Sequence, residues 1–357
     1  MSVADTEQTG PDEVGGEQEA GAEEVGAEEV AAEPMGPDRF RELAGAIQDE
    51  LGKVMVGQAE IIRLALVAMI GRGHVLLEGV PGLGKTVLVR SMAAALDLEF
   101  ARVQFTPDLM PGDITGSHIV TEDDAGRRRF EFQPGPLFTN LLLADEINRA
   151  TPKTQSALLE AMQERQVTTG DHTRPLPAPF FVLATQNPIE HEGTYPLPEA
   201  QLDRFFFKLV APRPNVSELV EIASRTTGVD DIALAPAASG PDLVAMARLA
   251  REVPVGSHVL EYAARLVEAT DPESANAPEE VKRYVRWGSS PRGMQTLIVG
   301  GRVLALLDGR FNVSYDDVAA VAAPGLRHRM FLNFEADAAG VDADQVVATV
   351  LASVKRD

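Results

Sequence analysis

One segment of the sequence has the residue types and the spacing needed to hold nucleotide phosphates. Gly79-Val80-Pro81-Gly82-Leu83-Gly84-Lys85-Thr86 matches the pattern G-x-x-x-x-G-K-[ST] at every fixed position. In such a loop, backbone N–H groups surround the phosphates, the lysine reaches the β and γ oxygens, and the hydroxyl ligates Mg²⁺. The residues expected to contact the nucleotide are Gly79, Pro81, Gly82, Leu83, Gly84, Lys85, Thr86 and Val87, with Thr86 also a metal ligand.

The flanking residues place this loop between a strand and a helix. Val75-Leu76-Leu77 is typical of a short buried strand, and apolar residues recur at helical spacing over 87–96. The start of a helix carries unpaired N–H groups and a positive dipole end, which favours a bound anion. The sequence therefore predicts that this chain binds a nucleotide.

A second segment supplies carboxylates. Leu141-Leu142-Leu143-Ala144-Asp145-Glu146 is an apolar strand that ends in two acids. In doubly wound sheets, such a strand end lies beside the phosphate loop, because ligands bind at the carboxyl edge. We expect Asp145 to hold Mg²⁺ through its water shell and Glu146 to polarise an attacking water.

Composition excludes several other kinds of site. The chain has no cysteine, so disulfides and thiolate metal sites are impossible, and His191-Glu192 lacks the second histidine of a zincin. The amino-terminal residues do not resemble a secretory signal, and the longest apolar stretch, Ile61 to Ile70, is too short to span a membrane. We therefore expect a cytoplasmic protein with no membrane span.

The net charge of −22 is unevenly distributed along the 357 residues. Residues 1–36 contain eleven acids and no Lys or Arg, so they contribute −11, and we expect a disordered acidic tail that serves either as a partner-contacting segment or as a solubilising extension. No basic stripe compensates for this charge. Nucleic-acid binding is therefore not expected, which argues against a helicase or clamp loader.

From residue 37 to residue 226 the pattern predicts an α/β core with a parallel sheet. Two amphipathic helices come first, over 40–51 and 61–70, and apolar runs of strand length then alternate with helical or inserted segments. The expected strands after Val75–Leu77 are Phe100 to Phe105, Leu141 to Leu143, Phe180 to Ala184 and Phe205 to Val210.

The connection between the second and third strands, residues 106–140, is too long for a simple loop. Ile114 to Val120 and Arg129 to Phe132 are expected to form a hairpin there, and Gln166 to Thr173 a second one. After Pro212-Arg213-Pro214 the α/β pattern stops. We expect a linker at residues 227–241 and an all-α lid domain over 242–357.

Taken together, these segments resemble the AAA+ ATPases, and within them the MoxR family, over roughly residues 38–357. The long insert also resembles the helix-2 insert of this branch. The matching segments are residues 73–86, Asp145-Glu146-Ile147-Asn148-Arg149-Ala150, Thr185-Gln186-Asn187-Pro188, Leu202-Asp203-Arg204-Phe205, Leu326-Arg327-His328-Arg329 and Leu332-Asn333-Phe334-Glu335.

The resemblance implies roles for residues that spacing alone does not assign. Asn187 is implied as the polar sensor that positions the attacking water; the alternative is an amide that satisfies a strand end. Val56-Gly57-Gln58 is implied as the adenine-contacting segment; the alternative is a turn that separates two helices. Arg204 is implied as the arginine finger of a neighbouring subunit's site; the alternative is an ion pair with Asp203 or Glu199. Arg149 is the second candidate for that contact.

Arg292, in Ser289-Ser290-Pro291-Arg292-Gly293, resembles the second sensor, a γ-phosphate reader on the lid. Ser290 suits a helix N-cap and Pro291 the first helical position. A cation in the first turn opposes the helix dipole by about 0.3–1 kcal/mol, and a bound phosphate would remove that conflict. A solvent-screened arginine is the alternative.

The resemblance also implies ATP and Mg²⁺ as cofactors and a homo-oligomeric ring, with a hexamer as the first expectation. It implies chaperone-like assembly, maturation or activation of protein complexes, with a partner that carries a von Willebrand factor A domain. Two alternatives stay open: an ATP-gated switch or scaffold with little turnover, and a metal-chelatase-like subunit. Arg127-Arg128-Arg129 in the long insert fits either a client contact or a solvated hairpin.

Overall fold

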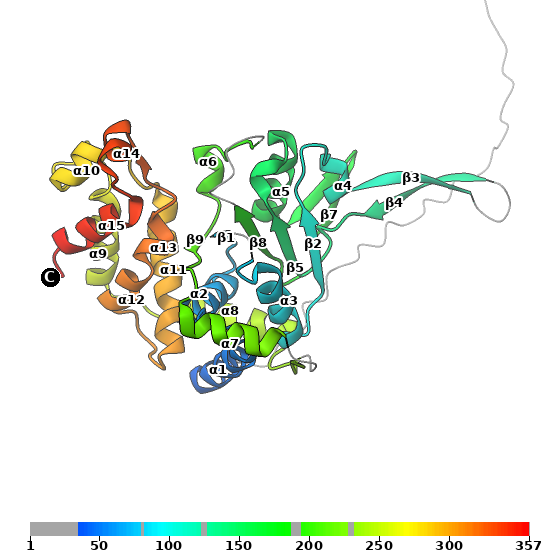
Figure 1. Ribbon diagram of the computed structural model, residues 1–357, viewed down its shortest axis with the longest axis horizontal. Helices are drawn as coiled ribbons and strands as arrows, with labels where there is room; N and C mark the ends of the chain where they lie inside the picture. The colour runs from blue at the N-terminus through cyan, green and yellow to red at the C-terminus, as the bar shows by residue number, and fades with distance from the viewer. Residues whose placement is uncertain (1–34, 80–81, 123–126, 187–193, 228–231, 357) are drawn as a thin grey trace, which may run out of the picture. The chain divides into compact units, whose positions relative to one another are not determined.

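The computed structural model describes residues 35–79, 82–122, 127–186, 194–227 and 232–356 (Figure 1). Residues 1–34, which make up nearly all of the predicted acidic tail, lie outside the described residues. Within the described part of the chain, no helix is both long and apolar enough to cross a membrane.

A five-stranded parallel sheet forms the centre of the amino-terminal region. The strands are β1 (Val75–Glu78), β2 (Phe100–Gln104), β5 (Leu141–Asp145), β8 (Phe181–Gln186) and β9 (Phe207–Val210). Their order is β2-β5-β8-β1-β9, and every neighbouring pair is parallel. The predicted α/β core with a parallel sheet is confirmed. The carboxyl ends of β1, β5 and β8 therefore meet at one edge of the sheet.

The two faces of the sheet are covered by different helices because side chains alternate along each strand. Leu77, Leu143 and Leu183 belong to one apolar core, while Leu76 and Leu142 belong to another. The first core is shared with α1 (Pro37–Val54), α2 (Ala59–Ile70) and α3 (Lys85–Ala95), and the second with α4 (Pro111–Thr115), the 3-10 turn η1 (Ile147–Arg149) and α5 (Pro152–Glu164). Figure 1 shows the sheet between these two layers.

Two hairpins extend from this core, as predicted. The long insert forms β3 (Gly116–Glu122) and β4 (Arg128–Pro134), which reach away from the sheet (Figure 1), and β6 (Gln166–Thr169) pairs with β7 (His172–Pro175). The predicted start of the first hairpin was wrong, because Ile114 lies in α4. Its side chain is buried in the second core, and the chain enters β3 only at Gly116, whose φ is +91°.

The carboxyl-terminal region is helical, as predicted. After α6 (Glu199–Leu202) and α7 (Val216–Thr226) come α8 (Gly240–Glu252), α9 (Ser257–Glu268), α10 (Glu279–Tyr284), α11 (Pro291–Leu307), α12 (Tyr315–Ala320), α13 (Ala322–Leu326), α14 (Phe334–Ala339) and α15 (Ala343–Ser353). A short antiparallel ribbon of β10 (Val285–Trp287) and β11 (Phe331–Leu332) adds to them. Because α11 packs against α1 and α2, these helices share the first apolar core with the sheet. The linker expected at residues 227–241 stays a prediction.

His74, immediately before β1, ties the sheet to α5. The ring is buried, with Nε2 3.0 Å from the Met162 carbonyl oxygen, and Nδ1 accepts a hydrogen bond from the Val182 N–H at 3.0 Å. Burial lowers the pKa of His74 to about 4. The imidazole is therefore neutral in the folded chain at neutral pH, and a proton on Nδ1 would break the bond to Val182.

Acid should therefore destabilise the fold through His74. The unfolded chain binds this proton near pH 6.5 and the folded chain only near pH 4, so stability is complete above 6.5 and falls between these values. We expect a loss of about 1.4 kcal/mol per pH unit. Denaturant unfolding of wild type and His74→Gln at several pH values checks this. The free energy of unfolding of His74→Gln should depend less steeply on pH than that of the wild type. The control His172→Gln, at an exposed site, should show the wild-type dependence. Equal slopes for His74→Gln and the wild type would contradict the role of His74.

Candidate functional site at the carboxyl edge of the sheet

The described part of the phosphate loop has the backbone conformation that the motif requires. Gly82 and Gly84 have φ values of +86° and +74°, a region that side chains disfavour, and α3 begins at the next residue, Lys85. The Lys85 Nζ donates to the Gly79 carbonyl oxygen at 2.6 Å. Val80 and Pro81 lie outside the described residues.

The acidic strand end lies within electrostatic reach of Lys85, as predicted. Burial lowers the pKa of Lys85, and the carboxylates of Asp145, Glu146 and Glu78 oppose that shift. The phosphate loop at the end of β1 and the acids at the end of β5 therefore form one site. A triphosphate there would meet a half-buried ammonium already balanced by carboxylates.

Asp145 is held by two neighbouring strands. Its Oδ1 accepts a hydrogen bond from the Thr185 hydroxyl at 2.6 Å, and its Oδ2 pairs with the Arg102 guanidinium at 2.7 Å. Thr185 is buried at the end of β8, and Arg102 comes from β2 on the other side of β5. Thr185 therefore fixes the orientation of the carboxylate, while Arg102 neutralises its charge.

Glu146 has a strained backbone and a restrained side chain. Its φ is +56°, uncommon for a residue with a side chain, and its N–H donates to the Thr185 hydroxyl at 2.9 Å. Its Oε2 accepts from the Gln104 amide at 2.5 Å and pairs with Arg149 at 3.2 Å. Such strain is typical of functional sites, and here it turns the second acid out of the strand direction.

The donors fit a magnesium ion that keeps most of its water. Mg²⁺ in nucleotide sites takes one or two protein oxygens together with phosphates and waters, and the Thr86 hydroxyl and the Asp145 carboxylate are oxygens of that kind. Thr86 is only partly buried, and its hydroxyl makes no hydrogen bond within the described residues. The Arg102 guanidinium neutralises the Asp145 carboxylate at the position where the ion would bind.

The segment expected to contact adenine lies against the phosphate loop. The Gln58 amide donates to the Leu83 carbonyl oxygen at 3.0 Å, and a side chain at Gly84 would meet Met55. Gly57 has φ +69° and packs against Glu218 of α7, while Val56 is partly buried. The hydrogen bond from Gln58 joins this segment directly to the phosphate loop.

Some site residues were missed from the sequence, and one cannot be placed. Asn187, the expected sensor, lies outside the described residues. Arg102 and Gln104 carry no motif, but they face the acids because β2 pairs in register with β5, placing Gln104 opposite Asp145. Thr185 belongs to the segment Thr185-Gln186-Asn187-Pro188 quoted above. Its hydrogen bonds to Asp145 and to the Glu146 N–H show that it holds the acid pair in place.

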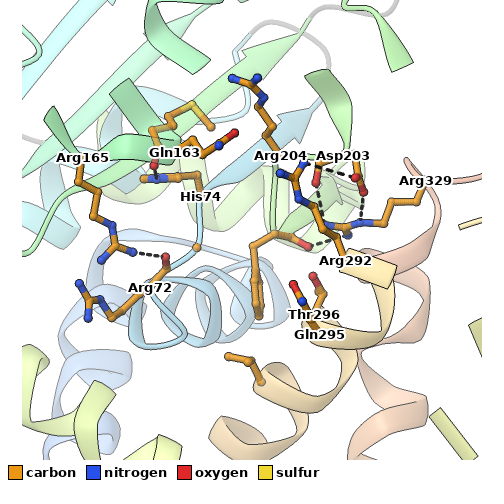
Figure 2. A pocket seen from close by; sticks show the side chains of 14 residues that line it. Arg72, His74, Gln163, Arg165, Asp203, Arg204, Arg292, Gln295, Thr296 and Arg329 are labelled. Atoms are coloured by element: carbon orange, nitrogen blue, oxygen red, sulfur yellow. Dashed lines mark hydrogen bonds and ion pairs between the residues drawn. The ribbon is translucent and has the colours of Figure 1, made fainter. Parts of the chain in front are cut away.

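Arg204 and Arg292 lie at the opposite, amino edge of the sheet. The Phe206 N–H donates to the carbonyl oxygen of His74, just before β1, and Arg204 precedes β9 by three residues. Arg292 pairs with Asp203 at 3.5 Å, so it is not simply screened by solvent, and Ser290 caps its helix as predicted. Figure 2 shows both arginines beside one cavity. The phosphate loop and these two arginines of one chain are therefore separated by the length of the strands.

Arg204 has no ion pair within the described residues. The alternative pairing with Asp203 or Glu199 is not observed, because Asp203 binds Arg329 at 2.9 Å, Arg292 and the Ser290 hydroxyl instead. Figure 2 shows the Arg204 side chain directed away from that cluster. Its guanidinium is therefore available to an anion from outside the chain.

Arg329 holds this edge of the sheet against the helical region. Its side chain is 2% exposed, and it donates to the carbonyl oxygens of Phe205 at 2.7 Å and of Asp203 at 3.2 Å. Burial lowers the pKa of Arg329 to about 10, although Asp203 opposes the shift. The neighbouring His328 ring lies 3.0 Å from the Phe205 carbonyl oxygen. The segment Leu326-Arg327-His328-Arg329 thus has a structural role, because it holds residues 203–206 against the helical region.

Comparison with known proteins agrees with this geometry. A family model described as "ATPase family associated with various cellular activities (AAA)" matches residues 74–207, and one described as an AAA lid domain matches residues 278–350. A crystal structure of a candidate ATPase from Cytophaga hutchinsonii is similar, with a TM-score of 0.84 and 40% identity over 89% of this chain and 96% of that one. Fold and site therefore define an AAA ATPase domain followed by its lid.

The relatives identify the family within that class. Chaperone MoxR1 of Mycobacterium tuberculosis is 44% identical over 85% of this chain and 80% of its own length. Protein MoxR of Paracoccus denitrificans is 38% identical over 83% of this chain and 89% of its own. The chain belongs to the MoxR family of AAA+ ATPases.

Thr185 offers a direct test of how the acid pair is held. Thr185→Val keeps the shape but removes the hydroxyl that binds both Asp145 and the Glu146 N–H. We expect ATP hydrolysis to fall about 10–100-fold, the usual effect of removing such a supporting group. Thr185→Ser keeps the hydroxyl and should stay near wild type. Steady-state hydrolysis and nucleotide affinity, measured together, check this; equal rates for the two variants would contradict the role.

Proposed function

We propose that this protein is a Mg²⁺-dependent ATPase whose site is completed by a neighbouring copy of the chain. One observation carries the proposal: the phosphate loop with its acids and the arginine pair Arg204 and Arg292 lie at opposite edges of one sheet. Strand β1 alone, with four residues, spans about 13 Å. Arginines so placed serve a nucleotide held by another subunit better than their own.

Each residue at the carboxyl edge then has a chemical task. The loop and Lys85 bind the phosphates of ATP, and Thr86 and Asp145 hold Mg²⁺ when it is present. Bound magnesium neutralises charge on the β and γ oxygens. Glu146 orients and polarises the attacking water with Asn187, and a trans arginine that stabilises transition-state charge is worth about 10³–10⁵ in rate.

A ring is supported by the surface around the nucleotide site. Helix α7 lies beside Gly57, yet it turns polar residues inward: Arg225 donates to the carbonyl oxygens of Gly52 and Lys53. Its apolar residues Val216 and Val220 are 78% and 65% exposed. An unpartnered apolar helix face favours an interface, here with the next subunit of a homo-oligomer, a hexamer in the family's pattern.

The hydrolysis would drive chaperone-like assembly, maturation or activation of protein complexes. The β3–β4 hairpin supports a client contact, because Phe130 is 80% exposed and Val120 is 55% exposed on a segment that reaches away from the core. A partner with a von Willebrand factor A domain is part of this proposal through the family alone. The relative's printed name, Chaperone MoxR1, is in keeping with it.

Glu146→Gln tests turnover against a nucleotide-gated switch. The amide cannot act as a base, so ATP should still bind while steady-state hydrolysis falls at least a hundredfold. Phosphate release with radiolabelled ATP and equilibrium nucleotide binding measure the two quantities. If the wild type already turns over as slowly as Glu146→Gln, the protein is a switch and the motor proposal fails.

Mixed assemblies test whether the arginines act between subunits. Arg204→Ala and Lys85→Ala chains are each expected to be inactive alone. At equal mixing, about a quarter of interfaces in a head-to-tail ring join an intact loop to an intact arginine, and activity should return in that proportion. Arg292→Ala mixed with Lys85→Ala should behave in the same way.

The matched control is a mixture of Arg204→Ala with Arg292→Ala. Both defects then lie on the same side of each interface, so no interface has both arginines and activity should not return. If activity returns when Lys85→Ala is mixed with Arg204→Ala but not when it is mixed with Arg292→Ala, then Arg292 acts on the nucleotide of its own chain. No recovery in either mixture, with ring formation verified by mass photometry, would overturn the trans assignment.

A further inference from the structure

The cavity at the amino edge of the sheet concentrates positive charge in an acidic protein. Its volume is about 270 Å³, and its lining contains five arginines but one carboxylate, Asp203 (Figure 2). The whole chain, by contrast, carries −22. The arginines are Arg72, Arg165, Arg204, Arg292 and Arg329. So many guanidiniums around one space favour an anionic ligand.

The cavity has two ends, and the sole carboxylate neutralises only one of them. Asp203 is bound by Arg329 and Arg292 at the end next to the helical region. At the other end, Arg165 donates to the carbonyl oxygen of Arg72 at 2.7 Å, and neither side chain has a carboxylate partner within the described residues. The proposed contact of Arg204 and Arg292 with a neighbouring subunit assigns no function to Arg72 and Arg165.

Arg72 and Arg165 are held in an unfavourable setting. Their φ values are +58° and +53°, each at or just after the end of a helix, where glycine or asparagine is usual. Burial lowers the pKa of Arg165 to about 10, and the like charges of Arg72 and Arg251 add to that shift. A bound anion would offset the repulsion between these like charges.

We propose that the Arg72–Arg165 end of this cavity binds inorganic phosphate. The cavity is smaller than the roughly 300–1,000 Å³ of pockets that enclose larger organic ligands, so it suits an oxyanion better than a whole nucleotide. Guanidinium groups bind phosphate oxygens in bidentate pairs, and a dianion matches two of them. The role rests on the proposed function, because hydrolysis at the neighbour's site would release phosphate next to Arg204 and Arg292.

The binding itself can be measured without any hydrolysis. Full-length Lys85→Ala impairs the phosphate loop, and calorimetric titration with inorganic phosphate should still detect a site. Adding Arg165→Gln should weaken it at least tenfold, Arg165→Lys should give an intermediate loss, and Arg283→Gln, an exposed lid position, should change nothing. Circular dichroism confirms folding of each variant. Unchanged affinity in a folded Arg165→Gln protein overturns the proposal, and if that variant does not fold, Arg72→Gln provides the same test.

Product inhibition tests the link to turnover. Added phosphate should inhibit wild-type hydrolysis, and Arg165→Gln should need at least tenfold more phosphate for the same inhibition. If the mixed assemblies fail while phosphate still binds at Arg165, the trans site is wrong and the phosphate site stands. If the mixed assemblies recover activity and Arg165→Gln binds phosphate as the wild type does, only this inference fails.

Discussion

The hydrogen bonds that Arg329 makes with residues 203–206 determine where Arg204 and Arg292 lie. A buried guanidinium is costly unless its donors are satisfied, and Arg329 satisfies them with the Asp203 carboxylate and successive carbonyl oxygens before β9. Because Asp203 is thereby occupied, the adjacent Arg204 forms no ion pair within the described residues. The same carboxylate draws in Arg292 from α11. One buried interaction thus attaches the helical region to the sheet and leaves Arg204 without an ion pair in the described part of the chain.

The other edge of the sheet follows a different electrostatic principle. Lys85, Asp145 and Glu146 balance one another, and Arg102 adds a positive charge at the point where a metal ion would bind. The carboxyl edge is therefore close to neutral as it stands, whereas the amino edge has an excess of positive charge. Binding of Mg²⁺ and a triphosphate to the first edge would add net negative charge, which in the proposed assembly the second edge of another copy would neutralise.

Local patterns predicted the strands, the phosphate loop and the acid pair, because each depends on residues that are close in sequence. The relation between the two edges could not be predicted in this way. That Asp203 pairs with Arg329 rather than with Arg204 depends on a residue 126 positions away. Arg102 and Gln104 reach the acids only through the register of β2 against β5, and Ile114 left the predicted hairpin because a buried contact outweighed its strand propensity.

The α7 surface and the phosphate loop are connected within one chain by a short series of contacts. The exposed apolar face of α7 lies on the outside, and on its inner side Glu218 packs against Gly57. The next residue, Gln58, donates to the Leu83 carbonyl oxygen in the phosphate loop. Because the Glu218 side chain lies against Gly57, which has a positive φ, a shift of α7 would be felt first by the segment that contacts the loop. In the proposed ring, a neighbour that covers α7 would therefore contact a helix that is only two contacts away from the phosphate loop.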